Sequence, residues 1–315
     1  MTGVLVLAGP TAAGKTALAL EVAELVSGEI VSADSRQVYR GLDIGTAKPA
    51  PEELRRVRHH LIDLIDVRQS YSAGRFASQA GQAIDEIQAR AGTPIVCGGT
   101  GFYIQALLEP LFEEPAAPGE QKALVRKRLA ERRAAEGSAA LHRDLALVDP
   151  DSANRLHPND FQRVSRALEL YYLTGRTLTE LSRSAGEQTT YVPFTVILDL
   201  PLDRLEERIR SRTARMLDGA WQAEVAGLLA AGVPPRAPGM QSLGYPEVLE
   251  LVAGRIGREE AFDRVVKKTR QYAKRQRTWF NKMAAALRTE PSKADPAEIV
   301  RRWHEHLEKL EGAGQ

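Results

Sequence analysis

The chain has 315 residues, of which 43% are hydrophobic and 27% charged, and its formal net charge is +2. This length allows two modest domains or one domain with a large insertion, and the composition is that of a globular protein rather than a disordered or fibrous one. The single cysteine excludes an intramolecular disulfide and a cysteine-based zinc site. The sequence shows no signal-peptide pattern and no run of the ~20 apolar residues that a membrane span needs. We therefore expect a cytoplasmic protein outside the membrane.

Strand-like and helix-like segments alternate along the first hundred residues. Apolar runs typical of buried strands occur at 4–8, 29–33, 61–65, 94–97 and, later, 195–200. Helical patterns lie between the first of these at 15–26, 52–58 and 73–91. Alternation of this kind predicts an α/β fold with a parallel sheet flanked by helices.

A strand-poor segment interrupts the alternation. The proline-rich stretch 112–119 is typical of a domain boundary, and the pattern from 120 to 190 is helical. We predict an inserted all-helical domain in an α/β core. The predicted bounds are 1–114 for the first part of the core, 115–192 for the insertion, 193–290 for the second part, with a basic helix, and 291–315 for an amphipathic C-terminal appendage.

The first strand leads directly into a phosphate-binding motif, which reads Gly9-Pro10-Thr11-Ala12-Ala13-Gly14-Lys15-Thr16. The glycines let the backbone curl so that successive N–H groups face phosphate oxygens, and the helix that follows adds the partial positive charge of its N-terminus. Lys15 reaches the distal phosphate, and the hydroxyl of Thr16 is placed to bind Mg²⁺, the one cofactor that we expect. The motif therefore predicts a P-loop NTPase-like core that binds a di- or triphosphate.

The acid that P-loop hydrolases place after a strand is missing from its usual position. The run 94–97 ends in Gly98-Gly99-Thr100-Gly101, whereas Asp34 follows the strand at 29–33. Residues beyond the carboxyl ends of parallel strands face the ligand crevice, so Asp34 and Thr100 should converge above the P-loop. An acid there can be a metal ligand or a general base, and it can equally be a turn or helix-cap residue.

Two predicted helices carry arginine and lysine in quantity. In 202–217 arginines recur at helical spacing opposite an apolar face, at 204, 208, 212 and 215. In 260–287 basic residues crowd the positions outside an apolar stripe, Lys274 and Arg275 among them. Both helices fit either a solvated face or an anion-binding one, the second resembling a footprint for a phosphate backbone. In the insertion, 157–163 predicts a helix start from which Arg163 and Arg166 project away from the apolar face.

Several blocks, taken together, resemble the bacterial tRNA dimethylallyltransferases, also called tRNA isopentenyltransferases. The resemblance covers about residues 4–282. Besides the P-loop, its blocks are Asp34-Ser35-Arg36-Gln37-Val38-Tyr39, Asp43-Ile44-Gly45-Thr46-Ala47-Lys48-Pro49, Gly98-Gly99-Thr100-Gly101, Arg155-Leu156-His157-Pro158-Asn159-Asp160 with Gln162-Arg163, Gln241-Ser242-Leu243-Gly244-Tyr245, and Thr269-Arg270-Gln271-Tyr272-Ala273-Lys274-Arg275-Gln276.

The resemblance implies a reaction and roles for some of these residues. The P-loop would hold the diphosphate of dimethylallyl diphosphate, and the five-carbon group would pass to the exocyclic N6 of the adenosine 3′ of the anticodon (position 37) in tRNA. Asp34 matches the general base, Arg212 matches a diphosphate ligand, and Thr11 and Thr100 match residues near the reacting groups. Because a stacked adenine is out of reach, we expect the base to flip out of its loop.

The resemblance also implies a tRNA-contacting surface. Its expected members are Asp34, Ser35, Arg36, Gln37, Thr100, Arg126, Gln162, Arg163, Val164, Ser165, Arg166, Gln241, Ser242, Leu243, Gly244, Tyr245, Pro246, Thr269, Arg270, Gln271, Tyr272, Ala273, Lys274, Arg275 and Gln276. Family members often carry arginine where this chain has Pro246, which removes a charged contact at that position. We expect a monomer, since no exposed apolar seam stands out.

Three other functions compete with this one. A P-loop small-molecule kinase would explain the P-loop and a helical insertion, but not the basic C-terminal helix. An adenylate isopentenyltransferase, which prenylates free adenine nucleotides, needs no long RNA footprint. An RNA-binding regulator with a relic P-loop conflicts with the intact Lys15, Thr16 and Asp34.

Overall fold

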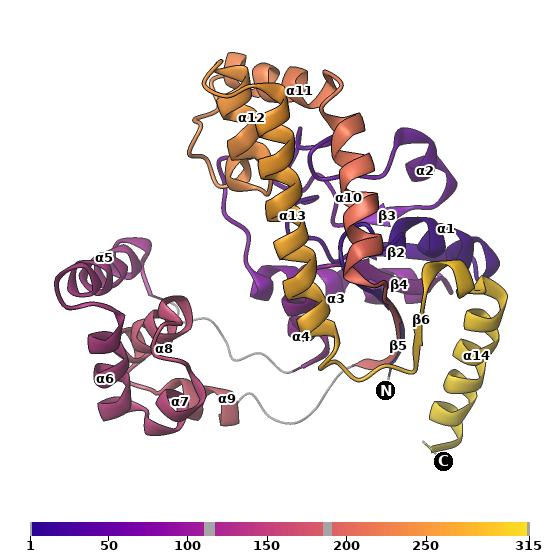
Figure 1. Ribbon diagram of the computed structural model, residues 1–315. Helices are drawn as coiled ribbons and strands as arrows, with labels where there is room; N and C mark the ends of the chain where they lie inside the picture. Colours follow the sequence, from indigo (N-terminus) through magenta and orange to yellow (C-terminus); the bar gives the residue numbers. More distant parts are fainter. Residues whose placement is uncertain (1, 110–116, 185–190, 314–315) are drawn as a thin grey trace. The chain divides into compact units, whose positions relative to one another are not determined.

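The computed structural model describes residues 2–109, 117–184 and 191–313 (Figure 1). The chain divides into two compact units, one formed by residues 1–108 and 190–315 and the other by residues 109–189. Much of the proline-rich stretch from which the sequence places a boundary lies outside the described residues.

The larger unit is built on a parallel sheet of six strands in the order β3-β2-β4-β1-β5-β6, as far as the described residues show. The strands are β1 (Thr2–Ala8), β2 (Gly28–Ser32), β3 (His59–His60), β4 (Thr93–Gly98), β5 (Tyr191–Leu198) and β6 (Leu287–Thr289). In the centre, Leu7 of β1 pairs with Cys97 of β4 on one side and with Val196 of β5 on the other. The predicted α/β fold with a P-loop NTPase-like parallel sheet is confirmed.

The sheet differs from the sequence-based prediction at both edges. The prediction of a strand at 61–65 is wrong, because β3 contains only His59–His60. Leu61 and Asp63 have left-handed backbones, with φ of 62° and 56°, which a strand cannot contain. Within that segment Ile65 forms an isolated parallel bridge to Tyr39. At the other edge β6, which pairs with β5, is missing from the prediction because three residues carry too little pattern.

Helices cover both faces of the sheet. Leu5 and Leu7 pack with α1 (Lys15–Leu25), α10 (Leu202–Met216) and α13 (Arg258–Phe280), whereas Val4 and Val6 pack with α3 (Ala73–Ala89) and α4 (Gly101–Leu108). Alternate residues of a strand face opposite sides, so a strand covered on both sides must be apolar throughout, as β1 is.

A third apolar cluster lies beyond the sheet, around the segment that follows β2. It joins Val38, Tyr39 and Leu42 to Trp221 and Tyr245. The last two come from α11 (Ala220–Ala230) and α12 (Tyr245–Val252), and the remaining short helices of this unit are α2 (Pro51–Arg56) and the 3₁₀ turns at Gly239–Gln241 and Pro291–Lys293. The segment after β2 therefore rests on helices that come almost 200 residues later in the chain.

The C-terminal segment is an integral layer and not an appendage. Helix α14 (Pro296–Ala313) packs beside α1, and its Ile299 and Trp303 are buried in the same core as Leu5. The Trp303 ring lies 6.1 Å from that of Phe194 on β5. The amphipathic pattern after Pro291 indicates that one face of this helix is buried, but the sequence alone does not show which part of the protein covers it.

The smaller unit is helical and has a core of its own. Its helices are α5 (Gly119–Glu136), α6 (Ser138–Val148), α7 (Pro150–Arg155), α8 (Phe161–Thr174) and α9 (Leu178–Ser184). Helix α8 starts where the sequence predicts, with the carboxylate of Asp160 accepting the N–H of Arg163 at 3.3 Å, and ends at Gly175, whose φ is 69°. Among the described residues, no helix is both long and apolar enough to cross a membrane.

Candidate active site

The P-loop has the backbone that its sequence predicts. Gly9, Ala12 and Gly14 have φ values of 153°, 64° and 92°, so the chain turns tightly between β1 and α1. At Gly9 no side chain fits, because a Cβ would collide with the carbonyl oxygen of Leu198 on β5. The turn directs backbone N–H groups and the N-terminus of α1 toward one space, an arrangement suited to phosphate oxygens.

Three cations surround this turn. Lys15 Nζ donates to the carbonyl oxygen of Pro10 at 2.8 Å, and Arg208 Nη1 donates to that of Ala13 at 3.3 Å. Arg212 Nη2 donates to the hydroxyl of Thr11 at 2.9 Å. Burial lowers the pKa of both Lys15 and Arg212, and the nearby carboxylate of Asp34 acts in the opposite direction on each. Desolvated cations without a paired carboxylate favour an anionic ligand that supplies the missing charge.

Asp34 lies at the carboxyl end of β2, facing the P-loop. Its Oδ1 accepts the backbone N–H of Arg36 at 2.8 Å, which leaves Oδ2 for other partners. Thr100 fixes the segment to the end of β4, since its hydroxyl accepts the N–H of Ser35 at 3.0 Å and its own N–H donates to Ala33 at 3.1 Å. The predicted convergence of Asp34 and Thr100 is therefore present in the structure, held by the backbone of two neighbouring strands.

The side chain of Gln276, on α13, joins the two loops at the centre of the sheet. Its oxygen accepts the N–H of Thr11 at 2.8 Å, and its nitrogen donates to the carbonyl oxygen of Gly99 at 2.7 Å. One turn earlier, Tyr272 lies beside Thr100, and burial, reinforced by the charge of Asp34, raises the pKa of its phenol to about 12. Helix α13 thus reaches the reaction site with buried polar side chains as well as with its exposed charges.

Two cavities meet at this site. The first has a volume of about 580 Å³ and lies along the P-loop, bounded by Lys15, Thr16, Cys97 and Arg208. The second, of about 320 Å³, is bounded by polar and basic residues of three segments: Asp34, Ser35, Arg36, Gln241, Ser242, Thr269, Tyr272 and Arg275. Four residues line both cavities: Thr11, Asp34, Thr46 and Arg212. Groups bound in the two cavities can therefore meet beside Asp34.

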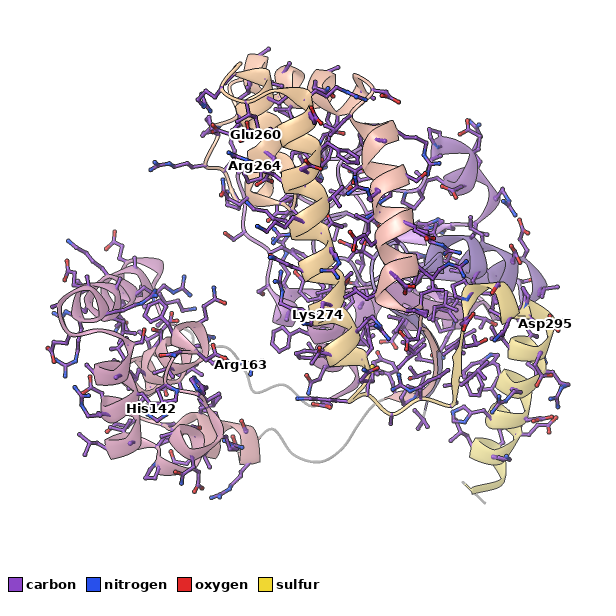
Figure 2. All side chains as sticks on the ribbon, viewed as in Figure 1. His142, Arg163, Glu260, Arg264, Lys274 and Asp295 are labelled. Atoms are coloured by element: carbon purple, nitrogen blue, oxygen red, sulfur yellow. The ribbon has the colours of Figure 1, made fainter. Side chains whose placement is uncertain are left out.

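The expected tRNA-contacting residues of the larger unit have varied positions. Gln37 and Asp34 line the first cavity. The second cavity is lined by Asp34, Ser35, Arg36, Gln241, Ser242, Leu243, Thr269, Tyr272 and Arg275. Tyr245 and Ala273 are fully buried, and Gly244 packs against Trp221. On α13, Arg270 pairs with Glu206, and Gln271, Lys274 and Arg275 are exposed; Figure 2 labels Lys274. Pro246 is half-buried.

The expected contacts of the helical unit are partly engaged within that unit. Arg126 and Arg166 both form ion pairs with Glu169, at 2.8 and 3.2 Å. Val164 is completely buried in the core of the unit, so its side chain faces no ligand. Gln162 and Arg163 are exposed and Ser165 is half-buried, and Figure 2 labels Arg163 on α8.

Sequence reasoning missed the loop between Asp43 and Pro49 as part of the site. It contributes Thr46 to both cavities and Ala47 to the first, where Gln37 donates to the carbonyl oxygen of Ala47 at 3.2 Å. The motif is visible in the sequence, but its two charged residues, Asp43 and Lys48, pair with each other, and neither lines a cavity. Trp221 and Met216, which line the second cavity, look like ordinary core residues of amphipathic helices.

Comparison with known proteins gives a consistent result. The sequence model of the IPP transferase family matches residues 37–283. Among similar proteins, a "tRNA dimethylallyltransferase 2" of Geotalea uraniireducens is 46% identical over 279 residues, 88% of this chain and 89% of that one. The tRNA dimethylallyltransferase of Geobacter metallireducens is 44% identical over 298 residues, 93% of this chain and 94% of that one.

Solved structures agree with the sequences. The tRNA Δ(2)-isopentenylpyrophosphate transferase of Staphylococcus epidermidis matches with a TM-score of 0.68 and 35% identity, over 98% of this chain and 100% of that one. A eukaryotic dimethylallyltransferase acting on tRNA matches with a TM-score of 0.76 and 28% identity, over 89% of this chain and 70% of that one. With its P-loop, its Asp34 and the length of these matches, the chain belongs to the IPP transferase family, among the relatives of the bacterial tRNA dimethylallyltransferases.

Proposed function

We propose that this protein transfers the dimethylallyl group of dimethylallyl diphosphate to the N6 amine of the adenosine at position 37 of tRNA. The observation that carries the proposal is the wall shared by the two cavities. A phosphate-binding cavity opens, at Thr11, Asp34 and Arg212, onto a second cavity with polar and basic walls. This arrangement suits a reaction between a diphosphate ester and a nucleobase that enters from elsewhere.

The first cavity supplies what a departing diphosphate needs. When the amine attacks C1 of the prenyl group, the C1–O bond breaks and its electron pair stays on the diphosphate. Backbone N–H groups of the P-loop, Lys15 and Arg212 stabilise that growing charge, and because they are already oriented the protein reorganises little during the step. The hydroxyl of Thr11 is held by Arg212, and Thr11 lines both cavities, so this hydroxyl would be close to the breaking bond.

Asp34 is suited to receive the proton. The attacking N6 becomes positively charged as its bond to C1 forms, and it must lose a proton to give the neutral product. Asp34 lines both cavities, and one of its oxygens accepts the N–H of Arg36, which leaves the other for the amine. A carboxylate in that position orients the amine before attack and removes its proton afterwards.

Mg²⁺ would bind mainly to the diphosphate. The described residues contain no group of three His, Cys, Asp or Glu side chains that could hold a metal, but the hydroxyl of Thr16 lines the first cavity beside Lys15. An oxygen donor combined with phosphate oxygens and water is the usual environment of Mg²⁺ in phosphate sites, so the residues present fit this ion. When bound, Mg²⁺ would supply further charge neutralisation to the leaving group.

The tRNA would enter from the second cavity. Arg36 and Arg275 line it, and Lys274 continues the positive charge along α13. Tyr272 adds a ring beside Thr100 that a flipped base can contact. Of the cations around the P-loop, Lys15 and Arg208 line the first cavity, whereas Arg212 lines both.

The test is incubation of the purified protein with Mg²⁺ and labelled dimethylallyl diphosphate, together with unmodified tRNA, AMP or no acceptor. A parallel mixture contains γ-labelled ATP and small-molecule alcohols. Label that enters tRNA, at an adenosine 3′ of the anticodon, is the expected result. Label in AMP alone would indicate an adenylate isopentenyltransferase, and transfer from ATP would indicate a kinase; either result contradicts the proposal.

A further inference from the structure

Among the described residues that line both cavities, only Thr46 neither lies on a helix of the sheet core nor closely follows one of its strands; it belongs to the loop formed by residues 43–48. Thr46 lines both cavities, and Ala47 joins the loop to Gln37 of the segment that carries Asp34. The loop is irregular, with Ala47 at a φ of 51°. A loop with such a backbone keeps one shape only when its surroundings hold it.

Glu224 of α11 holds the start of the loop. Its Oε2 accepts two consecutive backbone N–H groups, that of Asp43 at 2.7 Å and that of Ile44 at 2.6 Å. Hydrogen bonds to a carboxylate are shorter and stronger than those between neutral groups. These two hydrogen bonds join residues that are 181 and 180 positions apart in the sequence, so the loop is held by a tertiary contact and not by a local turn.

Tyr245 of α12 completes the arrangement. Its hydroxyl donates to the other oxygen of Glu224 at 2.6 Å. Burial, together with the charge of Glu224, raises the pKa of this phenol, which therefore stays protonated and able to donate. The two successive N–H groups of Asp43 and Ile44 are thus held by Glu224, whose carboxylate is itself held by Tyr245.

Packing limits the loop from the same side. A Cβ at Gly45 would collide with the rings of Trp221 and Tyr245, which meet edge to face with centroids 5.5 Å apart. From the other side, the buried ammonium of Lys48 contacts the carbonyl oxygen of Tyr39 at 3.0 Å and the carboxylates of Asp43 and Asp63. The loop is clamped between α11 and α12 on one side and the segment after β2 on the other.

We propose that Glu224 and Tyr245 are positioning residues, which hold the 43–48 loop so that Thr46 and Ala47 form the wall against which the prenyl part of the donor is placed. This proposal rests on the proposed function. It gives the Gly244-Tyr245 motif a role within the core instead of the tRNA contact that the resemblance implies. It also explains why a motif without catalytic side chains lies at the reaction site.

The two parts of the donor would be held by different segments of the chain. The diphosphate is bound by the P-loop, whose contacts with Arg208, Arg212 and Gln276 do not involve the 43–48 loop. The prenyl group has only apolar contacts to gain, and the loop supplies Ala47 to the first cavity, with Pro49 directly after the loop. Release of the loop should therefore weaken binding of the prenyl group and leave the binding of the diphosphate unchanged.

Hydrogen exchange tests the clamp independently of activity. In the full-length Glu224→Ala protein, peptides that cover 40–49 should exchange at least about 10-fold faster, because the N–H groups of Asp43 and Ile44 lose their acceptor. Tyr245→Phe should raise exchange in the same peptides by a smaller factor, because Glu224 then loses the hydroxyl that holds it. The matched control is Glu247→Gln, which alters a buried glutamate of the neighbouring helix α12, paired with Lys268, and should leave these peptides unchanged. Unchanged exchange in Glu224→Ala would overturn the proposal. Glu224→Gln keeps an oxygen that can accept both N–H groups, and should restore most of the protection.

Binding measurements test the consequence. For Glu224→Ala, the Kd of dimethylallyl diphosphate should rise about 10-fold, equivalent to losing contact with about two methylene groups, and the Kd of inorganic diphosphate should stay within about 2-fold. Equal weakening of both ligands, or of neither, would overturn the positioning role. If the parent protein binds dimethylallyl diphosphate no more tightly than diphosphate, the proposed function fails instead, and the exchange data alone decide whether the clamp exists.

Discussion

The backbone N–H of Thr11 donates a 2.8 Å hydrogen bond to the side-chain oxygen of Gln276, 265 residues later in the chain. The nitrogen of the same amide donates to Gly99 at 2.7 Å. One buried side chain therefore ties the loop after β1 to the loop after β4, with its donor and its acceptor both used. A carboxylate offers no donor and a lysine no acceptor, so the glutamine performs a task that charge alone cannot.

Replacement of Gln276 by methionine keeps its approximate shape and removes both hydrogen bonds. Because two buried backbone groups then lose their partners, we expect a loss of stability of about 1–3 kcal/mol per group and weaker binding of diphosphate, with unchanged tRNA affinity. Denaturant unfolding and titration with inorganic diphosphate measure these effects. Normal stability combined with weaker tRNA binding would mean that Gln276 contacts tRNA, as the resemblance implies.

Asp34→Ala should lower turnover by roughly 10²–10⁴-fold and leave the affinity for diphosphate nearly unchanged, because a base acts on the amine and not on the leaving group. Asp34→Asn is the matched variant, since its amide oxygen can still accept the N–H of Arg36 and preserve the turn. Single-turnover rates with saturating donor and tRNA separate the two roles. Recovery of turnover in Asp34→Asn would show that the residue acts only through the turn.

Arg212→Ala and Lys15→Ala should impair use of the prenyl donor without loss of tRNA affinity. Both side chains are hydrogen-bonded to the P-loop, Arg212 through Thr11 and Lys15 through Pro10. Donor binding by calorimetry and tRNA binding by gel shift provide the comparison. Arg212 also lines the second cavity, so a variant that binds diphosphate normally but loses tRNA would assign this guanidinium to the other substrate.

Neutralisation of Lys274 and Arg275 together should weaken tRNA binding and reduce its salt dependence, because each phosphate contact contributes about 0.7–0.9 to the slope of log K against log salt. Both side chains are exposed on α13, whereas the same helix buries Ala273 and Gln276 toward the core. Lys293→Gln with Lys309→Gln, which removes two exposed charges beside and on α14, is the control. An unaltered slope in the Lys274 and Arg275 variant would identify them as ordinary solvated charges.

Acid should destabilise the edge of the sheet through Glu29 of β2. Its carboxylate accepts two hydrogen bonds of 2.7 Å from Arg90 and one of 2.7 Å from His60. The hydrogen bonds from Arg90, chiefly, lower the pKa of Glu29 from 4.5 to about 2. Because this pKa is lower in the folded state, the stabilisation is complete above the unfolded value and is lost as the pH falls toward 2.

Unfolding free energies measured from neutral pH down to pH 2 test this account. Glu29→Gln should be less stable than the parent at neutral pH, and the difference should shrink as the pH falls. A constant difference between the two proteins over that range would contradict it.

The sequence by itself determined the features that local chemistry encodes. The P-loop follows from glycines, a lysine and a threonine at fixed spacing between a buried strand and a helix, and the central strands follow from runs that must be apolar on both faces. The start of α8 at Asp160 follows from a capping side chain and its end from Gly175. The position of Asp34 beside Thr100 follows from the rule that parallel strands end at one edge.

Only the tertiary structure decided which distant segments complete the site. Gln276 reads as one polar residue in a basic helix until its amide is seen between Thr11 and Gly99, and Glu224 reads as a surface glutamate until it meets the N–H groups of Asp43 and Ile44. The segment 291–315 likewise looks detachable until Trp303 is placed against Phe194. These contacts join residues more than a hundred positions apart, and periodicity, which reports which face of an element is buried, carries no information about the partner that buries it.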